Sequence, residues 1–214
     1  IIDIEDRYKE ELRNPIETPW KVINEITKGG FGMGDLAVIM GLPASGKSWF
    51  LASLGAHALK QGKNVIHYTL ELSDYYVGRR YDCILTGISI DELDLHKETI
   101  KHKIESFKSK LIIKRYFPRS ISSLGLRAHL DRCIRLGFKP DLIIVDYADL
   151  MALPPGGEFR HRIEHLYEDL KCIGGEYECP MFSVSQLSRA GIGEDYIDSD
   201  IAAAEAFSKN NTPD

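Results

Sequence analysis

The sequence feature that most constrains the fold is the stretch from Gly41 to Ser48, which matches the pattern G-x-x-x-x-G-K-[ST] at every fixed position. Phosphate oxygens need many donors that approach closely, and the glycines of this pattern let a tight loop turn its backbone N–H groups inward. Lys47 can then reach the β- and γ-phosphates of a nucleotide, and the Ser48 hydroxyl can bind Mg²⁺. This stretch, the phosphate loop, therefore predicts a nucleoside triphosphate site.

The residues on either side of the phosphate loop provide the strand–loop–helix context that the motif requires. The apolar run Asp35–Met40 predicts a short buried strand, and apolar residues recur at helical spacing from Lys47 to about Lys60. Backbone N–H groups at the start of that helix would face the phosphates. We therefore expect the nucleotide to contact the loop and the first helical turn, namely Gly41, Pro43, Ala44, Ser45, Gly46, Lys47, Ser48 and Trp49.

Three further segments predicted to be buried strands each lead into a polar residue. These are Val65–Leu70 with Glu71, Leu142–Val145 with Asp146, and Met181–Ser185 with Gln186. The carboxyl ends of parallel strands share one edge of a sheet, and ligands of open α/β sheets bind at that edge. An acid that ends a doubly covered strand is the usual partner of a phosphate loop, so we expect Asp146 to hold a metal ion together with Ser48.

Strands and amphipathic helices alternate along the chain, which predicts an α/β fold with a mostly parallel sheet and helices on both faces. Two short motifs mark expected helix starts. Ser73 is placed to cap the helix after Glu71, and Ser89–Glu92 spells a capping box that predicts a further helical segment after it. Near the N-terminus, the spacing of apolar residues 22, 23 and 26 predicts a helix with one apolar face.

The amino-acid composition excludes few classes of function. A net charge of -5 argues against a protein coated in basic patches but leaves nucleic-acid binding through local loops open. No apolar run approaches the length that crosses a membrane. The cysteines form no C-x-x-C pair, so we expect reduced core thiols in a cytosolic protein; they are Cys83, Cys133, Cys172 and Cys179.

The spelling H-x-x-E-H at His161–His165 is also found in metalloproteases, but we disfavour a metal site here. No third ligand is suggested by the sequence. These residues also fall on the polar side of a helix whose apolar side is well defined. We therefore interpret them as the solvated face of that helix.

Four stretches together resemble the motor domain of the DnaB-type replicative helicases, within the RecA-like ATPases. They are Gly29-Gly30 leading into the phosphate loop, Tyr68–Ser73 with Arg79-Arg80 behind it, Val145–Tyr147 with Leu150-Met151, and Ser185–Arg189. The second and fourth stretches discriminate best, because phosphate loops occur in many other ATPases. The resemblance covers about residues 17 to 208 and implies a RecA-like P-loop NTPase fold.

The resemblance also implies an activity and roles for particular residues. It implies an ATP hydrolase that uses ATP and Mg²⁺, in which Glu71 polarises the attacking water and Lys47 holds the phosphates. Gln186 would sense the γ-phosphate and relay its presence to DNA-binding loops. The expected partner is single-stranded DNA, and the expected assembly is a ring of identical chains, a hexamer in this family.

The loops that would line a DNA channel correspond to Ala152–Arg160 and Ser188–Asp200, where Arg160 and Arg189 are the available cations. The second loop departs from the family's chemistry because it also carries Glu194, Asp195, Asp198 and Asp200. The sequence also stops before the segment where the family carries basic residues that reach a neighbour's site. We therefore expect slow hydrolysis by this chain alone.

Two other functions fit the same residues. A RecA- or RadA-like recombinase would form filaments, and a KaiC-like regulatory ATPase would bind no nucleic acid, an alternative that the acidic second loop keeps open. We expect residues 1–16 to form an N-terminal linker or assembly helix, with Ile4, Tyr8 and Leu12 as its apolar stripe. Residues 17–214 would then be the ATPase domain, truncated at its C-terminal end, from a bacterial or phage-infected cytosol.

Overall fold

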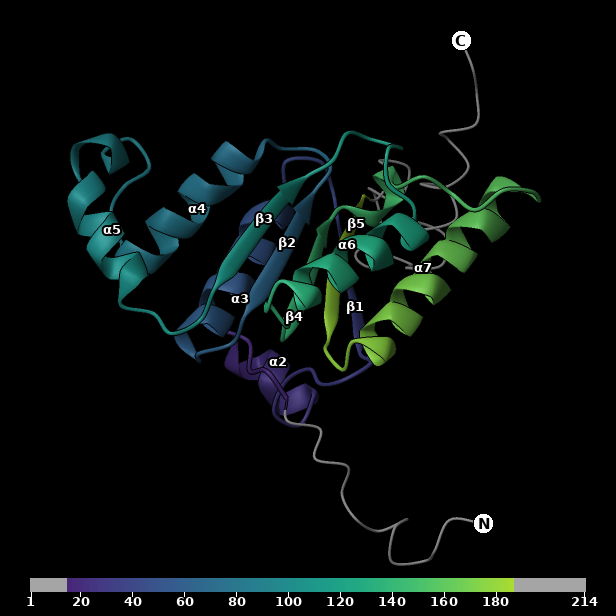
Figure 1. Cartoon of the computed structure of the whole chain (residues 1–214), viewed down its shortest axis with the longest axis horizontal. Helices are drawn as coiled ribbons and strands as arrows, with labels where there is room; N and C mark the ends of the chain where they lie inside the picture. The colour runs from purple at the N-terminus through teal and green to yellow at the C-terminus, as the bar shows by residue number, and fades with distance from the viewer. Residues whose placement is uncertain (1–14, 187–214) are drawn as a thin grey trace, which may run out of the picture.

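The computed structural model describes residues 15–186, whose strands form one five-stranded parallel sheet in the order β1-β5-β4-β2-β3 (Figure 1). The strands are β1 (Leu36–Gly41), β2 (Val65–Thr69), β3 (Leu111–Arg115), β4 (Leu142–Asp146) and β5 (Met181–Gln186). The helices are α2 (Lys21–Ile26), α3 (Lys47–Lys60), α4 (Asp74–Thr86), α5 (Lys97–Glu105), α6 (Ser123–Arg135) and α7 (Phe159–Glu176), with short 3₁₀ turns η1 (Leu93–Leu95) and η2 (Ala148–Leu150). The predicted α/β fold is confirmed.

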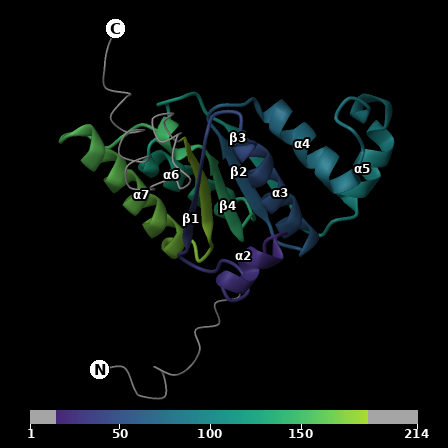
Figure 2. The same ribbon diagram turned by 180° about the vertical axis from the view of Figure 1, so that it is seen from behind.

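Helices cover both faces of the sheet, and each face has its own apolar core. Helices α6 and α7 pack on one face, which Figure 1 shows in front, whereas α3 and α4 cover the other face, seen in Figure 2. Strands β2 and β4 lie inside the sheet and are buried along their whole length. Their near-continuous apolar sequences follow from that position, because a strand covered on both faces has no solvent side.

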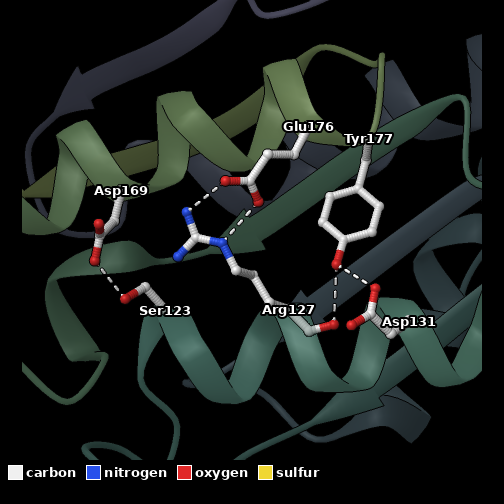
Figure 3. Close-up of polar contacts among 6 residues, drawn as sticks. All are labelled: Ser123, Arg127, Asp131, Asp169, Glu176 and Tyr177. Carbon is white, nitrogen blue, oxygen red and sulfur yellow. Dashed lines mark hydrogen bonds and ion pairs between the residues drawn. The ribbon is translucent and has the colours of Figure 1, made fainter.

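Polar side chains join α6 to α7 along the outside of their contact (Figure 3). The Arg127 guanidinium donates two hydrogen bonds to the Glu176 carboxylate, at 2.7 and 3.1 Å. The Tyr177 hydroxyl donates to Asp131 at 2.7 Å, and the Ser123 hydroxyl donates to Asp169. These contacts fix the two helices relative to each other on one face of the sheet.

Two local predictions are only partly confirmed. A helical segment follows Ser89–Glu92 as predicted, but Ser89–Glu92 forms a turn rather than a capping box, and α5 begins only at Lys97. The chain first folds into η1, which buries Leu93, so burial of this side chain takes precedence over the local capping signal. Helix α2 forms where the spacing predicts it, but its apolar face is not covered within this chain: Val22 and Ile26 are 65% and 76% exposed.

Smaller features refine the sequence interpretation. Ile16, expected in the N-terminal segment, is buried and forms an antiparallel bridge with Phe31, so it is part of this fold. The four cysteines are free thiols, but Cys172 is exposed and is not a core residue. Among the described residues, no helix is both long and apolar enough to cross a membrane.

Candidate nucleotide-binding site

The register of the parallel strands brings the predicted site residues to one edge of the sheet. Gly41 at the end of β1 pairs with Gln186 at the end of β5, and Thr69 at the end of β2 pairs with Asp146 at the end of β4. The backbone N–H of Leu70 donates to the carbonyl oxygen of Asp146 at 2.7 Å. Residues far apart in sequence therefore meet because four strands end at this edge.

The phosphate loop joins β1 to α3 and needs glycine at two positions for different reasons. Gly46 precedes α3 with φ of 86°, a left-handed conformation that favours glycine. Gly41 has no such torsion, but a Cβ there would lie 2.8 Å from the Ser45 hydroxyl oxygen. A larger residue at position 41 would thus push the loop outward, which explains a glycine there.

A cavity of about 280 Å³ lies beside the loop. Its walls include every residue predicted to contact nucleotide except Gly41, together with Glu71 and Gln186. Three residues that were not predicted also line it, namely Leu72, Arg80 and Tyr147. Asp146 does not line the cavity, because it is only 1% exposed and lies beneath the loop region.

The Lys47 ammonium group is held by the loop itself. Its Nζ donates to the carbonyl oxygens of Gly41 and Leu42, at 2.9 and 2.7 Å. Burial lowers the pKa of Lys47, and the negative charges of Glu71 and Asp146 oppose this shift. An ammonium group held inside the phosphate loop is well placed to bind phosphate oxygens.

Asp146 is a buried carboxylate whose hydrogen-bonding capacity is largely unused. Neither of its side-chain oxygens forms a hydrogen bond of normal geometry among the described residues, although the Ser48 hydroxyl lies close enough to interact with it. Burial raises the pKa of Asp146, as does Glu71, whereas the nearby Ser48 hydroxyl and the cations Arg80 and Lys47 lower it. Unpaired buried carboxylate oxygens are unfavourable, and a divalent cation with oxygen ligands would satisfy them. The pair Ser48 and Asp146 thus fits Mg²⁺.

Arg80 is the cation of this site that sequence reasoning did not assign a role. It lines the cavity from α4, its guanidinium carbon lies 5.1 Å from the Trp49 ring centroid, and its Nη1 is buried without a described hydrogen-bond partner. Burial lowers the pKa of Arg80, and Asp146 and Glu71 oppose this. Its position three residues after the core residue Val77 on an amphipathic helix could have indicated an inward direction.

Asp149, to which the sequence analysis also assigned no role, connects three elements. Its carboxylate accepts hydrogen bonds from the Tyr167 hydroxyl on α7 at 2.6 Å and from the Ser185 hydroxyl on β5 at 2.7 Å. Burial raises its pKa, whereas these hydrogen bonds and one from the backbone N–H of Gln186 lower it. Asp149 thereby fixes the end of β5, directly beside Gln186.

Of the two residues predicted to contact DNA, only Arg160 is in the described part of the chain, and it is not at the cavity. Arg160 is exposed in the first turn of α7 and does not line the cavity. The segment before it is held by Arg162, whose Nε donates to the carbonyl oxygen of Pro154 at 2.7 Å. Arg189 lies outside the described residues. His161 and His165 are exposed on α7, and the described residues contain no group of three or more metal-binding side chains of the His, Cys, Asp and Glu types.

The sequence matches the family described as DnaB-like helicase C terminal domain over residues 15–195. It is 29% identical over 205 residues to a DnaB-like replicative helicase of Enterobacteria phage T4, a match that covers 87% of this chain and 42% of the relative. It is also 26% identical over 183 residues to the replicative DNA helicase DnaB of Geobacillus stearothermophilus, covering 82% of this chain and 40% of that protein. The chain thus spans about two fifths of the length of these relatives.

Solved structures agree with this comparison at the level of the fold. A DnaB-like replicative helicase, described together with its interactions with primase, superposes with a TM-score of 0.68 at 16% identity, covering 85% of this chain and 46% of that one. An isolated ATPase domain superposes with a TM-score of 0.71 at 15% identity, covering 92% of this chain and 74% of that one.

Proposed function

Because this chain belongs to the family of DnaB-like helicase C-terminal domains, we propose that it is the ATP-hydrolysing motor of a replicative DNA helicase. The observation that supports this most directly is the cavity beside the phosphate loop, which Glu71 and Gln186 also line, with the unpaired oxygens of Asp146 buried next to it. Phosphoanhydride hydrolysis needs charge neutralisation, a positioned water and in-line geometry, and these residue types supply all three.

In this proposal the phosphate loop binds the nucleotide. Its backbone N–H groups and the Lys47 ammonium would hold the phosphates, and Lys47 would exchange two carbonyl contacts for phosphate oxygens. Ser48 and Asp146 would hold Mg²⁺, which when bound neutralises the charge that develops on the phosphates. Arg80 adds a further positive charge to the cavity wall.

Hydrolysis depends on the side chains that face the cavity from the other strands. Glu71 is exposed in the cavity wall, where its carboxylate would accept a hydrogen bond from the attacking water and turn it toward the γ-phosphate. Gln186 would hydrogen-bond to the γ-phosphate. Because Gln186 ends β5, its contact would bias the position of the residues that follow.

Movement on DNA would be driven through the segments that follow β4 and β5. Residues Ala152–Arg160 follow η2, and Ser188–Asp200 follows Gln186. Loops at these positions can change with nucleotide state while the sheet stays fixed. We propose that Arg160 and Arg189 contact single-stranded DNA there.

Assembly into a ring, with six copies expected, completes the proposal. The apolar stripe of Ile4, Tyr8 and Leu12 in residues 1–16 needs a partner surface. A groove of about 580 Å³ between α4 and α5 is a candidate surface on an adjacent copy, because Leu93, Ile100 and Ile104 line it within a rim of charged side chains. Such a ring would act in the cytosol of a bacterial or phage-infected cell, as its phage relative suggests.

Binding to single-stranded DNA tests the helicase proposal against a regulatory ATPase. We expect the ATP-loaded assembly to bind a labelled oligonucleotide without sequence preference, with affinity that falls as salt rises. Arg160→Ala and Arg189→Ala should each weaken this binding and leave ATP binding unchanged. Absence of DNA binding at low salt would contradict the proposal. Open filaments on DNA in electron micrographs, instead of closed rings, would favour the recombinase.

A further inference from the structure

Positive charge is concentrated in one part of this acidic chain. Between Glu105 and Asp131 the sequence contains no acidic residue. The same stretch contains Lys108, Lys110, Lys114, Arg115, Arg119 and Arg127. The net charge of -5 therefore conceals a stretch of sequence whose charged residues are all basic, although Arg127 is neutralised by its ion pair with Glu176.

The centre of this stretch is residues 114–119, which we name the β3 exit segment. Lys114, Arg115 and Arg119 are exposed, and none of them forms an ion pair with another residue in the described part of the chain. The Arg115 guanidinium carbon lies 5.0 Å from the centroid of the Phe117 ring. Phe117 is 67% exposed, so a large apolar ring and a cation are presented together.

Backbone contacts hold this segment in place. The N–H of Tyr116 donates to the carbonyl oxygen of Thr69 at 2.9 Å, and the N–H of Ser120 donates back to Phe117 at 3.0 Å. The N–H of Arg119 donates to the carbonyl oxygen of Leu150 at 2.6 Å. A fixed surface loses less conformational entropy when a ligand binds than a mobile loop does.

The same contacts place the segment beside the first proposed DNA loop. Leu150 lies two residues before Ala152–Arg160, and the N–H of Ala152 donates to the carbonyl oxygen of Ile121 at 2.8 Å. In Figure 1 the chain leaves β3 at the upper end of the sheet and crosses toward α6 at that same end. None of residues 114–119 lines the nucleotide cavity, so the nucleotide does not account for their charge.

The chemistry of this surface fits a single nucleic-acid strand. Exposed cations neutralise backbone phosphates, and an exposed aromatic ring offers a stacking surface for an unpaired base. The second proposed DNA loop, Ser188–Asp200, is acidic and provides few phosphate contacts. Additional cations at the same edge of the sheet would compensate for that deficit.

We propose that the β3 exit segment is part of the DNA-binding surface of this protein. Arg115 and Arg119 contact phosphates of single-stranded DNA, and Phe117 stacks on a base. The inference rests on the proposed helicase function and adds contacts beyond Arg160 and Arg189.

An oligonucleotide titration of the assembled, ATP-loaded protein tests the arginines. We expect Arg115→Ala and Arg119→Ala each to weaken oligo-dT binding roughly five-fold at about 0.1 M salt, and each to lower the slope of log affinity against log salt by about 0.7. The matched control is Arg135→Ala, which removes an exposed arginine at the far end of α6. It should change neither quantity, and ATP binding should be unchanged in all three variants.

A fluorescence measurement tests the aromatic ring without removing it. Phe117→Trp should show quenched tryptophan emission when oligo-dT binds, because a base stacks on the ring. Leu136→Trp, at a site 76% exposed beyond the far end of α6, is the control and should show none.

The outcomes separate this inference from the function on which it rests. If the parent binds DNA but the arginine variants bind equally well, only the inference is wrong. Loss of assembly in those variants would make the segment a subunit contact and would also overturn it. If the parent binds no DNA, the proposed function fails together with the inference.

Discussion

At the scale of single residues, nucleotide binding and hydrolysis should depend on different side chains. Lys47 lies in the phosphate loop and Glu71 lines the cavity; in the proposed mechanism the former holds the phosphates of bound ATP, whereas the latter acts only on the attacking water. We predict that Lys47→Ala loses ATP affinity. Glu71→Gln should retain ATP affinity and lose turnover by roughly 10²–10⁴-fold, the usual contribution of a general base.

Binding of a fluorescent ATP analogue and release of phosphate by the assembled protein would measure the two effects. Glu98→Gln makes the same change at an exposed position on α5 and should alter neither quantity. Equal turnover in Glu71→Gln and the parent would remove Glu71 from its proposed role.

The ionised Asp146 carboxylate should lower the stability of the ligand-free protein near neutral pH, because burial disfavours its charge and so raises its pKa. The folded protein holds the Asp146 proton to higher pH than the unfolded chain does. The associated stability is therefore present below the pKa of the unfolded state and is lost as pH rises through the folded pKa. We predict that Asp146→Asn, which cannot ionise, raises the melting temperature of the nucleotide-free protein near neutral pH by about 2–4 °C.

Thermal denaturation over a range of pH would test this prediction. The difference between parent and variant should shrink as pH falls into the ordinary range of aspartate, where both side chains are neutral. Mg²⁺ with ATP should stabilise the parent more than the variant. If the variant melts at a lower temperature than the parent at neutral pH, the prediction is wrong, and interactions within the protein already offset the cost of burying this carboxylate.

At the scale of elements, Asp149 links η2, α7 and β5 close to Gln186. The Tyr167 hydroxyl donates to Asp149 at 2.6 Å, and Ser185 donates to the same carboxylate. We predict that Tyr167→Phe lowers the free energy of unfolding by about 1.5–3 kcal/mol, the usual range for a hydrogen bond to a charged group. ATP turnover should also fall, because the end of β5 positions Gln186.

Tyr177→Phe is a matched control for that change. Its hydroxyl also donates to an aspartate, Asp131, but this pair lies on the exposed side of the α6–α7 contact (Figure 3). Water can replace the hydrogen bond there, so we expect a smaller loss of stability and normal turnover. Urea denaturation and steady-state kinetics would compare the two. Equal losses in both variants would argue against a special role for Asp149.

At the scale of the whole molecule, the proposed ring makes activity depend on assembly. A basic side chain from a neighbouring subunit typically accelerates ATP hydrolysis at such sites by about 10³- to 10⁵-fold. We predict that, in a protein that also carries the basic residues expected after residue 214, turnover per chain rises with protein concentration and follows the mass measured by light scattering. Leu12→Asp, on the proposed apolar stripe, should shift both curves to higher concentration.

Glu11→Asp is the control for the assembly prediction, because it changes a neighbouring residue that is not on the stripe. Turnover per chain that is independent of concentration, in a protein that stays monomeric, would contradict the need for a neighbour. Assembly that is unaffected by Leu12→Asp would instead assign the interface to other residues.

The sequence alone determined the features that depend on local pattern. The phosphate loop is a continuous motif, and helix α3 begins and ends where its spacing predicts, at Lys47 and Lys60. Asp146 and Gln186 at strand ends, and Glu71 just after β2, could be placed at one edge because parallel strands end together. For the same reason the parallel sheet with helices on both faces could be predicted.

Only the tertiary structure decided which distant residues meet. Asp149 contacts Tyr167 and Ser185 across three elements, and Arg119 lies beside Leu150, yet no local spacing connects these positions. Arg80 reaches the cavity because α4 packs against α3 and aims one helical face at the loop. Strand register and helix packing set these contacts. Both depend on the free energy of the whole core, so no short segment of sequence can determine them.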